Sequence, residues 1–209
     1  PSDTDRVMKS VDSFELSGHE VSYHDRWGGW YVTGQQGALR HMGNVLGTRG
    51  EEGNFSIDRE KNANLSSLGQ FYSEDKYPAK GSDLLALLIL DHQIGMHYRL
   101  MEAHYRVRQA MYDREHTPPG EDPRSNYDSE LRESAETIVR YLLFCDEAPL
   151  GSDPVASDST YRETFLAGKK PAKSGRSLRD LRLKDRIFEY RCSYMIHNSC
   201  LLYTSDAAD

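Results

Sequence analysis

The stretch that decides the fold is residues 82–115, SDLLALLILDHQIGMHYRLMEAHYRVRQAMYDRE. Ser82 is a good helix N-cap, and Asp83 would lie in the first turn, where a carboxylate meets the positive end of the helix dipole. One glycine, Gly95, interrupts the pattern, and the next prolines are residues 118–119. At 1.5 Å per residue this helix would be about 50 Å long, so we expect either a kink near Gly95 or fraying after Met111.

A second helix is predicted over residues 128–144, after a connector of prolines and charged residues at 117–127. Its apolar residues recur at helical spacing and form one stripe: Leu131, Ala135, Ile138, Val139, Leu142, Leu143 and Cys145. Two helices joined by a short connector pack as an antiparallel hairpin. We expect the hairpin to bury Leu84, Leu88, Ile138 and Leu142.

The remaining sequence predicts short elements packed against this hairpin. Residues 1–80 are rich in Gly, Ser, Asn and Asp, with one β-type run at 30–33, and read as a loop-rich segment. Residues 160–168 form a short helix capped by Thr160 and Glu163, residues 178–183 a helical turn, and residues 192–197 the start of another element. The predicted fold is therefore mainly α. Its parts are a loop-rich segment (1–80), a helical region (81–199) and a tail (200–209).

Composition restricts the classes of partner. The mean hydropathy is -0.73, which is polar for a globular chain. The net charge is -7 with both signs mixed, so the sequence has no basic stripe of the kind that marks a nucleic-acid interface. No run of eighteen apolar residues occurs, which argues against a membrane span. Cys145 and Cys192 are too few for a disulfide scaffold, and their spacing fits no zinc motif.

Both ends of the chain suggest a fragment of a longer protein. The sequence begins with Pro1, and its last ten residues, CLLYTSDAAD (200–209), match the translation of a transposon-derived sequencing adapter. We therefore expect residues 200–209 to be an artefactual tail with few tertiary contacts. The alternative is a genuine polar terminus.

Eight histidines invite a search for metal sites. On a helix, His92 and His97 point about 140° apart, and His97 and His104 lie about 10 Å apart along the axis. Neither pair can hold one zinc ion alone, because zinc–nitrogen distances are about 2.0–2.1 Å. No metallohydrolase, nucleophile-elbow, phosphate-loop or dinucleotide motif occurs. The helical histidines therefore read as surface or packed structural residues.

A second cluster combines aromatic, glycine and ligand-type residues. Trp27 and Trp30 flank a glycine pair in RWGGWYVTG (26–34), and His41 and Met42 follow in RHMGN (40–44). One interpretation is an aromatic plug over the hairpin followed by a glycine turn. The other is a pocket for a planar cofactor, with His41 or Met42 reaching an iron.

These motifs resemble a family of large, uncharacterised bacterial proteins that contain a cytochrome c domain. The resemblance spans residues 14–197 and rests on 26–44, SDLLALLILDHQIGMH (82–97), YLLFCDEAPL (141–150), GRSLRDLRL (175–183) and RIFEYRCSYMI (186–196). It implies a periplasmic or otherwise extracytoplasmic protein associated with haem c, acting in one-electron transfer or redox sensing with an unidentified redox partner. The family's Cys-x-x-Cys-His motif would lie upstream of Pro1, and Cys192 and His197 do not replace it.

The same resemblance supplies candidate site residues. A haem c takes a distal Met or His, for which Met42 is the first candidate, His41 the second, and His92 or Met96 the next, with Trp27 and Trp30 as walls. This hypothesis requires His41 or Met42 beside residues 92–97, at an exposed apolar cleft. In the structural alternative, both tryptophans fill the space against Leu87 and Leu88, and the histidines face outward.

Two other functions stay open. One is a haem-dependent oxidoreductase, in which Asp91 and His92 would be acid–base groups at an open iron position. The other is a non-catalytic helical interaction module.

Overall fold

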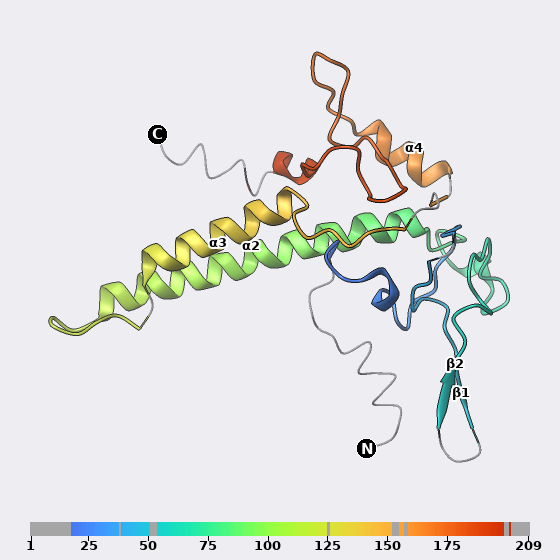
Figure 1. The fold of residues 1–209 in the computed structure, drawn as a ribbon, viewed down its shortest axis with the longest axis horizontal. Coiled ribbons are helices and arrows are strands. Elements are labelled where there is room, and N and C mark those ends of the chain that lie inside the picture. Colours follow the sequence, from blue (N-terminus) through green and yellow to red (C-terminus); the bar gives the residue numbers. More distant parts are fainter. Residues whose placement is uncertain are drawn as a thin grey trace.

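The computed structural model describes residues 18–37, 39–50, 54–124, 126–151, 155–156, 159–198 and 201. Within these ranges the chain is rich in helix, and Figure 1 shows a long helical hairpin projecting from a base of loops and shorter elements. The elements in chain order are η1 (Tyr23–Asp25), β1 (Gly47–Arg49), β2 (Phe55–Ile57), η2 (Glu74–Lys76), α2 (Leu84–His116), α3 (Tyr127–Leu142), α4 (Ser159–Ala167) and η3 (Tyr194–His197).

Helix α2 begins one residue later than predicted. The carbonyl of Ser82 accepts the Thr33 N–H at 2.8 Å, which keeps the chain extended up to Asp83. Asp83 is therefore the N-cap, and its carboxylate accepts the Ala86 N–H at 3.0 Å. The helix continues through Gly95 without interruption and ends just before the prolines, at His116.

Helix α3 returns antiparallel to α2. Asn126 caps it, and its side-chain oxygen accepts two backbone N–H groups of the first turn. Arg106 pairs with Glu130 near the tip, while the Tyr141 hydroxyl donates to the His92 carbonyl at 3.1 Å near the base. The predicted hairpin is confirmed, although α3 runs from Tyr127 to Leu142 rather than over 128–144.

The buried face of α3 differs from the predicted one. Leu84 and Leu88 are fully buried, as expected, but Ile138 and Leu142 are only half-buried. Other members of the predicted α3 stripe are exposed: Leu131, Ala135, Val139, Leu143 and Cys145. Tyr141 lies at the centre of the interface instead. The cause is that α3 contacts α2 along a face rotated from its most apolar side.

The short elements also depart in part from the sequence-based expectation. The β-type run at 30–33 forms one isolated bridge, in which Thr33 pairs with Asp83. An antiparallel pair that was not predicted, β1 and β2, lies further along the chain. Helix α4 begins at Ser159, so Thr160 lies inside it rather than capping it. Residues 178–183 form no helix, because Leu181 pairs with Phe188 in an antiparallel bridge. The expected element at 192–197 is η3.

One prediction falls largely outside the described residues. Of the expected tail (200–209), only Leu201 is described, and it is partly buried against the core.

Among the helices that the structure describes, none combines the length and the apolar composition that a bilayer crossing requires.

Candidate functional site

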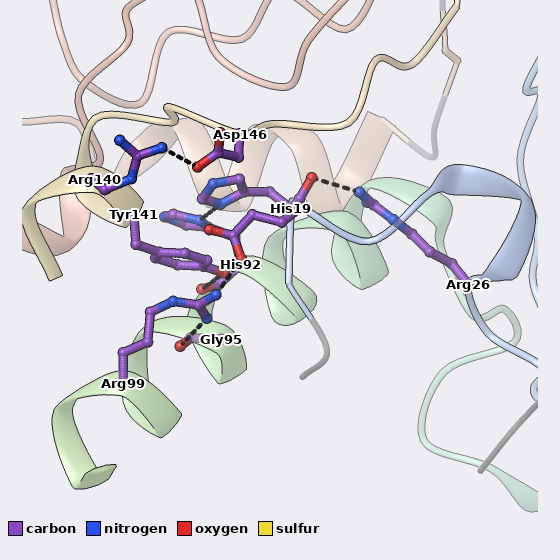
Figure 2. A network of polar contacts seen from close by, with 9 residues as sticks. His19, Arg26, His92, Gly95, Arg99, Arg140, Tyr141 and Asp146 are labelled. Carbon is purple, nitrogen blue, oxygen red and sulfur yellow. Dashed lines mark hydrogen bonds and ion pairs between the residues drawn. The ribbon is translucent and has the colours of Figure 1, made fainter. Parts of the chain in front are cut away.

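The base of the hairpin contains a cluster of buried polar and aromatic side chains, here called the histidine cluster: His19, His92, Tyr141, Phe144 and Ser193. Figure 2 shows His19 and His92 facing each other beside Tyr141. Their Nδ1 atoms lie 2.8 Å apart, and the Nε2 atom of His92 lies 2.6 Å from the Ser193 hydroxyl. The His92 ring stacks on Tyr141 and Phe144, with centroid distances of 5.2 and 4.7 Å. The cluster joins segments that are 73 and 101 residues apart.

Backbone contacts position the two ends of this chain of hydrogen bonds. The Arg26 guanidinium donates to the carbonyls of His19 and Val21 at 2.8–2.9 Å and so fixes the loop that carries His19. Ser193 donates its N–H to the Leu142 carbonyl, and its hydroxyl accepts the Met195 N–H at the start of η3. Ser193 therefore links α3 to the C-terminal segment and caps η3.

Burial keeps both imidazoles neutral. His19 and His92 are fully buried. Desolvation lowers the pKa of His19 to about 2 and that of His92 to about 3, and the Arg99 charge adds to both effects. The hydrogen bonds allow two tautomer chains, in which protons are donated either from His19 toward Ser193 or from Ser193 toward His19.

Arg99 covers the cluster on the side of α2. Its guanidinium lies 3.9 Å from the centroid of the Tyr141 ring and donates to the Gly95 carbonyl at 3.0 Å (Figure 2). It also pairs with the Glu20 carboxylate. The ion pair and the stacked ring separate His92 from solvent. Ser193 is also fully buried.

A second group, here called the tryptophan cluster, adjoins the first: Tyr23, Trp27, His41, Met42 and Asp91. The Trp27 indole donates to the Asp91 carboxylate at 2.8 Å, and the His41 ring lies edge-on to Trp27 with centroids 5.0 Å apart. Burial raises the pKa of Asp91 to about 6, which the Arg26 charge partly opposes. Burial also lowers the pKa of His41 to about 4. Because Asp91 precedes His92, the two clusters share one turn of α2.

Residues 40–44 form a closely packed turn beside the tryptophan cluster. A Cβ atom on Gly43 would lie 2.4 Å from a methyl carbon of Val32, so only glycine fits there. Asn44 has a φ of 65°, and its side-chain amide pairs with both the N–H and the carbonyl of Val32 at 2.7 Å. The Met42 N–H donates to the Arg26 carbonyl at 2.9 Å. These contacts give Gly43 and Asn44 a structural role in the turn.

The predicted site residues are brought together only in part. Trp27 lies between His41 and the Asp91–His92 turn, as the cofactor hypothesis requires. Trp30, however, is 55% exposed, while Met42 and Met96 are buried. The structural alternative is also met only in part, because His41 and His92 are buried rather than facing outward.

As they lie here, these residues do not fit an axial-ligand role. Both ring nitrogens of His92 already have partners, in His19 and Ser193. Met42 and His41 are both buried, and the His41 ring lies edge-on to Tyr23 and Trp27. The predicted ligands line neither the cavity of about 240 Å³ beside Arg179 and Tyr194 nor the cavity of about 970 Å³ between residues 78–83 and α4.

Sequence reasoning missed the roles of His19, Tyr141 and Ser193. None of them belongs to a predicted apolar stripe or to a ligand motif, although Tyr141 and Ser193 lie in stretches that carry the family resemblance. Their partners are far away in the sequence. Among the described residues, no group of three or more His, Cys, Asp or Glu side chains is placed to hold a metal ion.

A comparison with protein-family models, curated proteins and solved structures finds no match for this chain. The family resemblance and the function it implies therefore stay predictions.

Proposed function

We propose that the described region is a non-catalytic helical interaction module, in which a packed base holds the hairpin as a protein-binding arm. The observation that carries this proposal is a row of exposed side chains along α2, here called the α2 seam: Ile94, Tyr98, Met101, Tyr105, Arg108 and Tyr112. The aliphatic and aromatic members are 43–65% exposed. Contiguous exposed apolar surface of this kind marks protein-interaction sites.

The seam is distinct from the face of α2 that packs on α3. Met96 and Ala110 are buried on that inner face, and Ala103 is half-buried between them. Helix α2 therefore has two apolar faces, of which α3 covers one. Tyrosine and methionine are enriched at interfaces, because both supply large contact areas, tyrosine on a rigid ring and methionine on a flexible side chain.

The base favours a structural role over a catalytic one. His92 and Ser193 are fully buried, and the Ser193 hydroxyl already accepts the Met195 N–H. The polar network connects three segments around the first half of α2 and so fixes the direction in which the hairpin projects. A buried hydrogen-bond network of this kind restricts how the segments that it joins can be arranged.

The experiment places a photo-reactive amino acid at Met101 on the seam or at Glu136, an exposed position on α3. We expect Met101 to give discrete adducts with a polypeptide, mapped by mass spectrometry to a helical segment, and Glu136 to give none. The adducts should disappear when Tyr98→Glu and Tyr105→Glu are combined. Equal labelling from both positions, or none, would refute an interaction function for the seam.

Haem c-associated electron transfer or redox sensing outside the cytoplasm is a separate proposal, supported by the resemblance of residues 26–44 and 82–97 alone. An axial role for Met42 would require the turn at 40–44 to open, because its side chain is buried there. Met42→Ala in the haem-bearing protein should then lower the reduction potential and change the absorption spectrum. An unchanged spectrum and potential would remove Met42 from the iron.

A further inference from the structure

The spacing of the α2 seam is that of a coiled coil. Its residues alternate by four and three positions from Ile94 to Tyr112, a strict 3.5-residue repeat over about 27 Å of helix. In heptad terms, Tyr98, Tyr105 and Tyr112 occupy every a position. The d positions hold Ile94, Met101 and Arg108. Such a repeat favours a second helix packed along the seam.

Helix α3 is not that second helix. It covers the b, c and f positions of the same heptads, where Met96 and Ala110 are buried and Arg106 pairs with Glu130. The a and d positions point away from it and are exposed. Within the part of the chain that the structure describes, no helix covers the seam. Its occupant must come from elsewhere.

We propose that this occupant is a second copy of the chain, packed antiparallel along α2. This inference rests on the proposed function and names its partner. In a parallel pair, d positions meet d positions, so the two Arg108 guanidinium groups would face each other in the seam. In an antiparallel pair, d positions meet a positions, and every a position is a tyrosine. Each Arg108 then stacks on a tyrosine ring of the second copy, as arginine does in cation–π contacts.

One antiparallel register uses all six positions of both helices. It pairs Arg108 with Tyr98, Met101 with Tyr105 and Ile94 with Tyr112 of the other copy. The sulfur of Met101 and the ring of Tyr105 form a favourable contact. The α2 seam thus contains both the Arg108 cation and the tyrosine rings on which it can stack. Their spacing is the same when a second α2 runs in the opposite direction. A second copy satisfies this pattern without a special partner sequence.

The shape of the molecule agrees with this arrangement. The hairpin projects from the base (Figure 1), and the aliphatic and aromatic residues of the seam are exposed. Antiparallel packing places the two bases at opposite ends of the pair, where they do not compete for space. The interface is isologous, as in most two-fold dimers.

The first test measures the mass of the purified full chain by sedimentation equilibrium over a range of concentrations. We expect a monomer–dimer equilibrium that Tyr98→Glu with Tyr105→Glu weakens at least about 100-fold, because unpaired carboxylates would be buried in the seam. Tyr77→Glu is the matched control: Tyr77 is 55% exposed in a loop outside the seam, and its replacement should leave the dimer unchanged. Circular dichroism checks that both variants keep the helical fold.

The second test fixes the orientation, with the native cysteines replaced by serine. Chains carrying Ile94→Cys should form a disulfide with chains carrying Tyr112→Cys, and Ile94→Cys chains alone should not. Disulfides among Ile94→Cys chains alone would overturn the antiparallel arrangement. So would a dimer that resists the double glutamate variant, which would place the contact elsewhere.

The two proposals fail separately. A chain that stays monomeric at all concentrations, with Met101 cross-linking a helix of another protein, overturns the second copy and leaves the interaction module standing. A monomer without any adduct from Met101 overturns both.

Discussion

Mild acid should destabilise this protein steeply, through three buried histidines. Burial, the main cause, lowers the pKa of His19, His41 and His92 to about 2, 4 and 3. In the unfolded chain each would titrate near the ordinary value of about 6.5. Between about pH 4.5 and 6 the unfolded state therefore binds up to three more protons than the folded state. Stability rises with pH wherever the unfolded state binds more protons, so it falls as the pH drops below about 6.5.

Buried carboxyl groups oppose this effect. Burial raises the pKa of Asp91 to about 6, so near pH 5 the folded state holds a proton that the unfolded state lacks. The pKa values of Glu20 and Glu147 are also raised by burial and act in the same direction as that of Asp91. A net uptake of one to two protons on unfolding remains. It corresponds to a loss of roughly 1 to 3 kcal/mol per pH unit, a large share of a typical stability of about 5–15 kcal/mol.

The assay is urea unfolding followed by tryptophan fluorescence, in half-unit steps from about pH 7 to about pH 4.5. His41→Phe should reduce the slope of unfolding free energy against pH by the amount that corresponds to roughly one proton taken up on unfolding. This change in slope is expected whatever the variant does to the absolute stability. His104→Phe is the control, because His104 is exposed. A flat profile between pH 6 and pH 4.5, or equal slope changes from both variants, would refute the burial of neutral imidazoles.

Other predictions test the fold. Leu88→Ala should cost about 2–5 kcal/mol in urea unfolding, whereas Leu142→Ala, at a half-buried site, should cost less than about 2 kcal/mol; equal costs would contradict the rotated face of α3. Gly43→Ala should cost more than about 2 kcal/mol, because its methyl group would overlap Val32; a neutral effect in thermal unfolding would disprove this close approach. Trp27→Phe should leave a buried acceptor unpaired and cost about 1–3 kcal/mol, a loss that urea unfolding above pH 6 would detect.

Local chemistry made the hairpin predictable from the sequence. Three local signals determine the helices: the apolar run from Leu84, the prolines at 118–119 and the helical spacing of residues 131–145. Each of them affects the backbone only within a few residues of its own position. Both helices were therefore placed to within about two residues. The start of α2 was displaced by one, because a distant residue, Thr33, binds the Ser82 carbonyl.

The face of α3 that becomes buried was decided by tertiary structure. The apolar stripe predicted the wrong centre, because the contact with α2 is set by Tyr141, whose hydroxyl reaches the His92 carbonyl across the hairpin. Helical periodicity identifies an apolar side but not what covers it. On α2 the same limit applies: the sequence holds two apolar faces, and only the fold shows that α3 takes one and leaves the α2 seam exposed.

The candidate site divides in the same way. The sequence alone marked Trp27, His41 and the Asp91–His92 turn as residues of interest, and the fold brings them together. Only tertiary structure brings His19 and Ser193 to His92, across 73 and 101 residues. No local sequence pattern predicts this contact. A buried imidazole and a hydroxyl are stabilised by hydrogen-bond partners and by exclusion from water, and here both are supplied by segments that are distant in the sequence.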